Sequence, residues 1–234
     1  MEHKLEWLSE EEGRVAFFEG DTPFFAAEIF LTGEEEAEIK IQDIVFDEKS
    51  IKSDGMSKEI ISRMIKLLPE CFRLLWDEGL EEVVLVEQQG TKIAEILDST
   101  GVVQKAYSEY MMKLYIEHQK STSCGLGFLE LTKTEDGYIC ENNDKTFFCR
   151  LLSYEAEAEG EQSFYLYEVE VKKRNRNKGI ATRCLTQLFS LLSEEASLTI
   201  YLQVGSYNEP AVHLYKKLGF DVSEELGYYV PEEE

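Results

Sequence analysis

Basic residues crowd one short loop of an otherwise acidic chain. The formal net charge of the 234-residue protein is −23, yet five of its 24 lysines and arginines fall within seven positions. Gly179 ends this loop, and since glycine has no Cβ the backbone can turn tightly and bring its N–H groups close to a ligand. This composition is typical of a phosphate-binding turn, and a solvated surface loop is the alternative. The five residues are Lys172, Lys173, Arg174, Arg176 and Lys178.

A strand and a helix are expected on the two sides of the loop. Residues 164–171 have a strand-like composition, and from Ile180 to Leu192 apolar residues recur with helical spacing. The free N–H groups and the positive end of the dipole at a helix N-terminus suit a pyrophosphate. An apolar helix face packed on a core would hold that N-terminus still.

A second motif, Asn208 to Phe220, follows a strand predicted at residues 198–204. Its Pro210 is typical of a first helical turn, and its Gly219 of the position just after a helix. The residues Leu214, Tyr215 and Leu218 have the spacing of a core-packing edge of this helix, with the Tyr215 hydroxyl reaching water. His213 in the same motif is interpreted as a surface or packing residue.

The two motifs together resemble those of the GCN5-related N-acetyltransferase (GNAT) family. The matching patterns are Arg176-x-x-Gly179-x-Ala181 and Asn208-x-x-Ala211-x-x-Leu214-Tyr215-x-x-x-Gly219-Phe220, within roughly residues 128–230. The resemblance implies an acyltransferase with acetyl-CoA as co-substrate. The cofactor-binding residues that it implies are Val169, Val171, Arg174, Arg176, Asn177, Lys178, Gly179, Ile180, Ala181, Thr182, Asn208 and Ala211.

The same resemblance implies roles for these residues. Residues 176–181 would offer backbone N–H groups to the pyrophosphate, and the neighbouring lysines (Lys172, Lys173 and Lys178) together with Arg174 would face the 3′-phosphate. The Val171 N–H would bond the acetyl carbonyl and polarise it. Asn208 would bond the pantetheine arm, and Tyr215 would protonate the leaving thiolate.

The general base stays open between two carboxylates. Glu168 and Glu170 lie on the strand that would meet the acceptor, and strand alternation sends both to one face unless a bulge redirects one. Simple exposure to solvent is the alternative for both.

The first half of the chain looks like a degenerate copy of the second. Gly13 matches Gly137 (137 − 13 = 124), and Gly101 matches Gly219 (219 − 101 = 118). The same register puts Asp54-Gly55 in the anion-binding turn, where a carboxylate repels phosphate. Gly90 and Leu97 would take the places of Asn208 and Tyr215, respectively. Chance similarity is the alternative.

We therefore expect an α/β (α+β) protein of two tandem GNAT-like modules, residues 1–120 and 121–234, each a mixed, mostly antiparallel sheet flanked by helices. We interpret the polar stretch 119–125 as the linker between the two modules. A helix is expected over residues 58–76, interrupted at Pro69.

Composition narrows the class of protein further. No apolar run approaches the roughly 20 residues of a membrane span and no signal core follows Met1, so a soluble, cytoplasmic protein is expected. Five cysteines without Cys-x-x-Cys spacing favour neither a disulfide framework nor a metal site. The 47 acidic residues against 24 basic ones disfavour nucleic acid and anionic membranes as partners. They fit a cationic acceptor, or a solvated acidic surface.

The leading interpretation is an N-acetyltransferase that moves the acetyl group of acetyl-CoA to a primary amine of a small molecule or peptide by direct attack in a ternary complex. A CoA-binding sensor without turnover and an interaction protein are the alternatives. The acceptor and the oligomeric state are not determined by the sequence.

Overall fold

The structure is a computed structural model that describes residues 2–41, 44–46, 49–51, 57–119, 127–154, 156 and 160–232. The chain forms two compact units: unit 1 comprises Met1–Glu109 and Glu225–Glu234, and unit 2 comprises Tyr110–Glu224. The units therefore do not follow the expected division at residues 120 and 121. The reason is that strand β8 (Val103–Ile116) continues past Glu109, so its second half lies in unit 2.

Unit 2 is built around a sheet in which β9 to β12 pair antiparallel in chain order and β13 pairs parallel with β12. Helix α4 is the crossover between these two parallel strands. The elements are β9 (Leu129–Lys133), β10 (Gly137–Asn142), β11 (Phe147–Tyr154), β12 (Glu161–Val171), the 3₁₀ turn η2 (Lys173–Asn175), α4 (Ile180–Leu192), β13 (Ser197–Gly205) and α5 (Glu209–Lys217).

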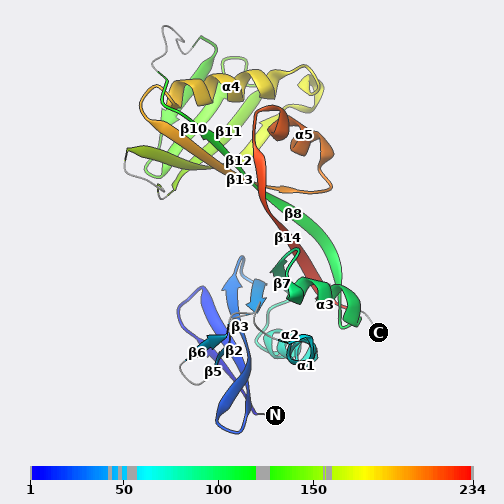
Figure 1. The fold of residues 1–234 in the computed structure, drawn as a ribbon. Coiled ribbons are helices and arrows are strands. Elements are labelled where there is room, and N and C mark those ends of the chain that lie inside the picture. Colours follow the sequence, from blue (N-terminus) through cyan, green and yellow to red (C-terminus); the bar gives the residue numbers. More distant parts are fainter. Residues whose placement is uncertain are drawn as a thin grey trace. The chain divides into compact units, whose positions relative to one another are not determined.

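The apolar face of α4 packs on one face of this sheet (Figure 1). Leu185 and Leu188 of the helix are fully buried in the same core as Leu198 and Ile200 of β13. The helix is thereby fixed with its N-terminus at the end of β12, as the apolar spacing predicted.

Unit 1 repeats the order of elements, with two helices where unit 2 has α4. The predicted helix over residues 58–76 is in fact two helices, because Pro69 lies in the first turn of the second one, where its missing N–H costs nothing. The elements are β1 (Glu2–Trp7), β2 (Glu12–Glu19), β3 (Thr22–Leu31), β4 (Glu36–Ile41), β5 (Ile44–Phe46), β6 (Lys49–Ile51), α1 (Lys58–Ile65), α2 (Leu68–Asp77), β7 (Glu82–Gln88) and α3 (Lys92–Thr100).

The repeat extends to the register of the strands. Gly13 lies opposite Ile29, and Gly137 lies opposite Leu152, so the offsets are 124 (137 − 13) and 123 (152 − 29). The second offset equals the spacing between the paired phenylalanines Phe24-Phe25 and Phe147-Phe148 in the sequence (147 − 24 = 123).

The parallel strand pair corrects one part of the sequence alignment. Glu36 lies opposite Glu82, and Glu161 lies opposite Ser197, with offsets of 125 (161 − 36) and 115 (197 − 82). The sequence repeat pairs residues 83–86 with residues 201–204, but the strand pairing matches them with residues 198–201. The reason is that the connection between the two parallel strands is longer in unit 1, where the paired positions are 46 residues apart (82 − 36), than in unit 2, where they are 36 apart (197 − 161).

Two long strands are divided between the units. Residues 103–109 of β8 belong to unit 1 and residues 110–116 to unit 2, whereas β14 (Asp221–Pro231) begins in unit 2 and ends in unit 1. Each strand follows the last helix of its repeat, so each repeat contributes part of its final strand to the other unit. In unit 1, Leu226–Tyr229 of β14 pairs antiparallel with Leu85–Gln88 of β7.

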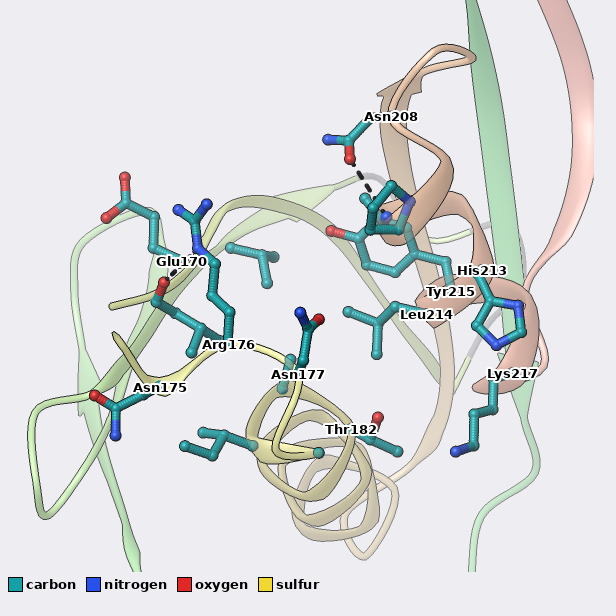
Figure 2. A pocket seen from close by; sticks show the side chains of 17 residues that line it. Glu170, Asn175, Arg176, Asn177, Thr182, Asn208, His213, Leu214, Tyr215 and Lys217 are labelled. Carbon is teal, nitrogen blue, oxygen red and sulfur yellow. Dashed lines mark hydrogen bonds between the residues drawn. The ribbon is translucent and has the colours of Figure 1, made fainter. Parts of the chain in front are cut away.

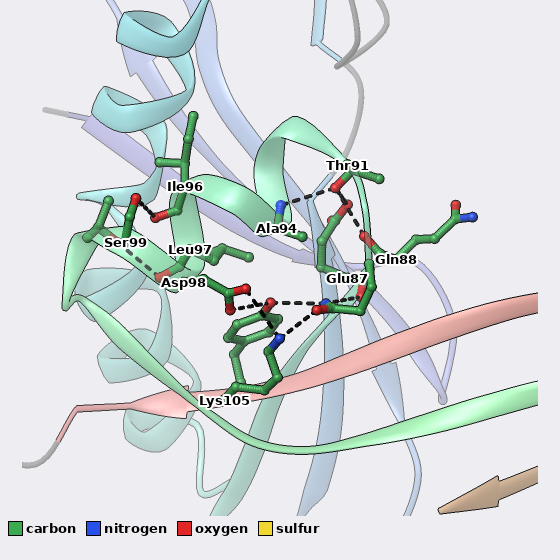
Figure 3. Close-up of polar contacts among 12 residues, drawn as sticks. Glu87, Gln88, Thr91, Ala94, Ile96, Leu97, Asp98, Ser99 and Lys105 are labelled. Atoms are coloured by element: carbon green, nitrogen blue, oxygen red, sulfur yellow. Dashed lines mark hydrogen bonds and ion pairs between the residues drawn. The ribbon is translucent and has the colours of Figure 1, made fainter. Parts of the chain in front are cut away.

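A polar network holds the end of β14 in unit 1 (Figure 3). Tyr229 is fully buried, and its hydroxyl donates to Asp98 Oδ1 (3.0 Å) and accepts from Gln89 Nε2 (3.0 Å). The Lys105 ammonium completes the network, at 2.6 Å from Gln89 Oε1 and 3.3 Å from Asp98 Oδ2. Tyr229 thus joins β14 to α3 and to the residue that follows β7, and Lys105 connects the same two partners to β8.

Several sequence-based predictions fall outside the described residues: the anion-binding turn with Asp54 and Gly55, the linker beyond Gln119, and Cys124. The other four cysteines are buried free thiols. In the described part of the chain, no helix combines the length and apolarity needed to cross a bilayer.

We expect Tyr229→Ala to destabilise unit 1 by about 3–5 kcal/mol, because it removes a large buried ring and takes one hydrogen-bond partner from each of two polar side chains. Hydrogen exchange should show faster exchange in β7 and α3, while α4 keeps its protection. Tyr229→Phe is the matched control and should lose only the hydroxyl contribution, about 1 kcal/mol. Unchanged exchange in β7 and α3 of the alanine variant would contradict the assignment of β14 to unit 1.

Candidate functional site

Strands β12 and β13 pair with each other, in parallel, only over residues 161–165 and 197–201. Their pairing ends at Tyr165 and Tyr201, although β12 continues to Val171 and β13 to Gly205. On its other edge, β12 has a bulge opposite the step from Phe148 to Arg150, and Glu168 there has a φ of +50°. A bulge bends its strand. The two strands therefore separate where the phosphate-binding turn was predicted.

A cavity of about 880 Å³, the first cavity, lies at this separation (Figure 2). Its walls come from the end of β12, the following loop, the first turn of α4 and one face of α5. The volume is within the usual range of ligand sites, about 300–1,000 Å³.

The N-terminus of α4 opens onto this cavity. Gly179 is the N-cap residue and has a left-handed φ of +70°, which favours glycine, and no side chain caps the helix. Gly179, Ile180, Ala181 and Thr182 all line the cavity. Since the first N–H groups of a helix have no partner within it, they are available to an anion.

Hydrogen bonding in the ladder directs one backbone donor of β12 toward the cavity. Lys172 N donates to Thr146 O (3.0 Å), and bonded pairs alternate along an antiparallel ladder. The next pair, Val171 and Phe147, is therefore non-bonded, and Phe147 N donates instead to Asn142 Oδ1 (2.9 Å). The Val171 N–H consequently points away from β11, to the side from which β13 has departed.

The basic side chains of the loop differ in their position relative to the cavity. Arg176 lines the cavity, with its Nε donating to the Val171 carbonyl at 3.0 Å. The neighbouring Arg174 and Lys178 are not among the lining residues, nor are Lys172 and Lys173.

Helix α5 supplies the opposite wall. Asn208 is its N-cap residue, and the side-chain oxygen accepts from Ala211 N (3.4 Å). Tyr215 is 7% exposed and packs edge-on against Phe220, with ring centroids 5.6 Å apart. Figure 2 shows its hydroxyl directed into the cavity. Burial, and to a lesser extent the Cys149 thiol, raises the pKa of Tyr215 to about 12.

The two candidate bases are separated by the bulge. Glu168 forms an ion pair with Arg150 (2.9 Å) and does not line the cavity. Glu170 lines the cavity rim and has no ion-pair partner among the described residues. Figure 2 shows its carboxylate directed outward, toward solvent.

Most of the residues expected from the sequence therefore meet at one cavity, and three do not: Glu168, Arg174 and Lys178. Those that line it are Val169, Glu170, Val171, Arg176, Asn177, Gly179, Ile180, Ala181, Thr182, Asn208, Ala211 and Tyr215.

Sequence reasoning missed five further lining residues. Four of them, Pro210, His213, Leu214 and Lys217, recur at helical spacing on α5, so the period that marks one helix face could have found them. His213, interpreted above as a surface or packing residue, is thus at the cavity. The fifth, Asn175, lies in η2, and no pattern in the sequence marks it.

The corresponding helix of unit 1 carries different chemistry. Thr91 is the N-cap residue of α3, and its side chain accepts from Ala94 N (3.1 Å), as Asn208 does in α5. The cap-to-cap offset is 117 (208 − 91), so Asp98, and not Leu97, has the place of Tyr215. Asp98 is engaged in the Tyr229 network, and neither residue offers a phenol.

Comparison with known proteins agrees with this geometry. Residues 99–220 match the family model "Acetyltransferase (GNAT) family". No curated protein matches the chain in sequence.

Solved structures similar to this chain include a GCN5-related N-acetyltransferase from Sphaerobacter thermophilus (12% identity, TM-score 0.60, covering 95% of this chain and 81% of that one). A tandem GNAT protein from the clavulanic acid biosynthesis pathway is similar as well (9% identity, TM-score 0.54, covering 95% and 83%). So is a GCN5-related N-acetyltransferase from Kribbella flavida (9%, TM-score 0.54, covering 89% and 87%). At these identities the likeness concerns the fold.

The family match spans more than half of the chain, from the end of α3 to the residue before β14, and includes the whole first cavity. The chain therefore belongs to the GNAT acetyltransferase family, whose members are acyltransferases that use acetyl-CoA.

Proposed function

We propose that unit 2 transfers the acetyl group of acetyl-CoA to a primary amine by direct attack within a ternary complex. The observation that carries the proposal is that the uncapped N-terminus of α4 and the buried hydroxyl of Tyr215 line the same cavity. One end of this cavity suits a pyrophosphate, and the other offers a proton donor.

The coenzyme fits the residues present. The first N–H groups of α4 would bind the pyrophosphate, with the Thr182 hydroxyl beside them, and Lys217 adds a cation from α5. Val169 and Val171 would lie along the pantetheine arm, and Asn208 would hydrogen-bond it. Once bound, acetyl-CoA supplies the activated acetyl group.

The Val171 N–H would polarise the acetyl carbonyl. As the amine nitrogen bonds to the carbonyl carbon, negative charge develops on the oxygen, and a fixed donor at that position lowers the barrier. Arg176 supports this donor by holding the Val171 carbonyl.

Tyr215 would donate its proton to the sulfur as the carbon–sulfur bond breaks. A phenol with a pKa of about 12 keeps its proton at neutral pH. The thiolate that leaves the carbonyl carbon accepts this proton, and the product is the free thiol of CoA.

Glu170 would accept the proton that the amine loses, directly or through one water. Of the two carboxylates, it is the one at the cavity and without an ion pair among the described residues. The acceptor is a small-molecule or peptide amine, and the net charge of −23 favours a cationic one.

Replacing Tyr215 with Phe tests the proton donor. We expect kcat to fall about 100-fold or more, because general acid catalysis contributes about 10²–10⁴-fold, whereas the Kd for acetyl-CoA measured by calorimetry should stay within about twofold. Tyr207→Phe is the matched control, since Tyr207 is 73% exposed and does not line the cavity. Unchanged turnover would contradict the role of Tyr215 as the proton donor, whereas acetyl-CoA binding without any turnover in the unaltered protein would favour a CoA sensor.

Replacing each candidate base with the neutral amide tests the assignment of Glu170. We expect Glu170→Gln to lower kcat/KM by about 10²-fold and to shift the pH dependence, because the amide cannot accept the proton. Glu168→Gln should change kcat/KM several-fold at most, through the loss of its exposed ion pair with Arg150. The reverse order of effects would assign the base to Glu168.

A further inference from the structure

The bulge in β12 decides which backbone donor faces the first cavity. The register between β11 and β12 shifts by one residue between Phe148 and Arg150, because β12 has one residue more than β11 at this place. After the shift, Lys172 N donates to the Thr146 carbonyl. If the register of the preceding residues continued, Val171 would lie opposite Thr146, and its N–H would make the bond that Lys172 now makes. The bulge therefore turns the Val171 N–H out of the ladder.

The unusual backbone of this bulge belongs to Glu168. Its φ of +50° lies in the left-handed region, which is unfavourable for a residue with a Cβ. Glycine would adopt this conformation at no such cost. The chain instead has a glutamate here, and its carboxylate forms the ion pair with Arg150 at 2.9 Å. An unfavourable backbone conformation is thus found together with a side-chain contact that can offset it.

The guanidinium of Arg150 contacts both strands at the register shift. Its Nε is buried, although the side chains of Arg150 and Glu168 are 42% and 51% exposed. It also lies over the ring of Phe148, the residue on the other side of the shift, at 5.7 Å from the ring centroid. An exposed ion pair contributes modestly to stability, and a left-handed backbone costs an amount of the same order. The contacts of Arg150 are therefore large enough to influence the shape of the bulge.

Neither member of this ion pair touches the space where the coenzyme is proposed to bind. Arg150 and Glu168 line neither the first cavity nor a smaller second cavity of unit 2, of about 320 Å³. An effect of Arg150 on the reaction must therefore pass through the backbone of β12.

We propose that Arg150 is a positioning residue for acetyl transfer. By pairing with Glu168 it holds the bulge, and the bulge directs the Val171 N–H toward the acetyl carbonyl. Glu168 then serves as the partner that fixes the strand and not as a base. This inference rests on the proposed function, in which the Val171 N–H polarises the carbonyl.

The test follows the backbone amide of Val171 by NMR while acetyl-CoA is added. In the unaltered protein we expect the Val171 signal to shift, together with the amides of residues 179–182. In Arg150→Ala the Val171 shift should be reduced, while residues 179–182 respond as before, because the N-terminus of α4 is held by a different set of contacts. Arg150→Lys keeps the positive charge and should restore part of the response.

Arg63→Ala is the matched control. Arg63 of unit 1 also pairs with a glutamate, Glu19, and also lies over a phenylalanine ring, that of Phe24, at 4.6 Å. Its replacement removes the same kinds of contact at a place outside the first cavity. The Val171 response in this variant should equal that of the unaltered protein.

Two substitutions of Glu168 separate the backbone conformation from the ion pair. Glu168→Gly and Glu168→Ala both remove the carboxylate, but only glycine adopts a left-handed φ at no cost. We expect Glu168→Gly to keep the Val171 response and Glu168→Ala to reduce it, as Arg150→Ala does. An equal response in the two variants would contradict the role given to the strained backbone.

Kinetics provide a second readout, with thiol release from acetyl-CoA and spermidine as the cationic probe amine. We expect Arg150→Ala to lower kcat about threefold to fivefold, while the Kd for acetyl-CoA stays within about twofold. A residue that only stabilises the fold would lower the melting temperature and leave kcat unchanged.

The outcomes distinguish this inference from the proposed function. A Val171 response in Arg150→Ala equal to that of the unaltered protein would overturn the inference. So would a response of residues 179–182 without one of Val171 in the unaltered protein, a result that would leave the coenzyme site in place. If acetyl-CoA shifts no amide of residues 169–182 in the unaltered protein, the proposed function itself is wrong.

Discussion

The separation of β12 from β13 is the constraint on which the proposed site depends. If the parallel pairing continued beyond Tyr165 and Tyr201, β13 would occupy the N–H of Val171, and no space would remain for a pantetheine arm. The bulge at Glu168 bends β12, and the core under α4 holds the helix N-terminus at the opening. Backbone donors, among them the Val171 N–H, are thereby left without a strand partner at the proposed site.

The two repeats have the same framework and different chemistry. Both have a parallel strand pair followed by a helix with a side-chain N-cap. In unit 1, Asp98 serves the network around Tyr229, and in unit 2 the corresponding Tyr215 faces a cavity. Since β8 and β14 each contribute to both units, unit 1 cannot be completed without the end of the chain. A structural role for unit 1 is consistent with this arrangement.

The sequence predicted the loop, α4 and α5 well, because glycine, proline and helical spacing mark them locally. It could not predict that β8 continues past Glu109, since strand sharing depends on pairing between segments distant in sequence. The sequence also could not show which of Glu168 and Glu170 lies at the cavity, because a bulge changes the alternation of side chains between the two faces of a strand. The density of basic residues in the loop led to the expectation that Arg174 binds the cofactor, but Arg174 does not line the cavity. A long exposed side chain need not face the cavity that its backbone borders.

Hydrogen exchange with and without acetyl-CoA tests the account most directly, because the proposed contacts are largely backbone N–H groups. The account predicts slower exchange at residues 169–182 and 208–215, including the Val171 amide and the first turn of α4, with no change in β7 or α3 of unit 1. Unchanged exchange in residues 169–182 at saturating acetyl-CoA, or protection confined to unit 1, would contradict it.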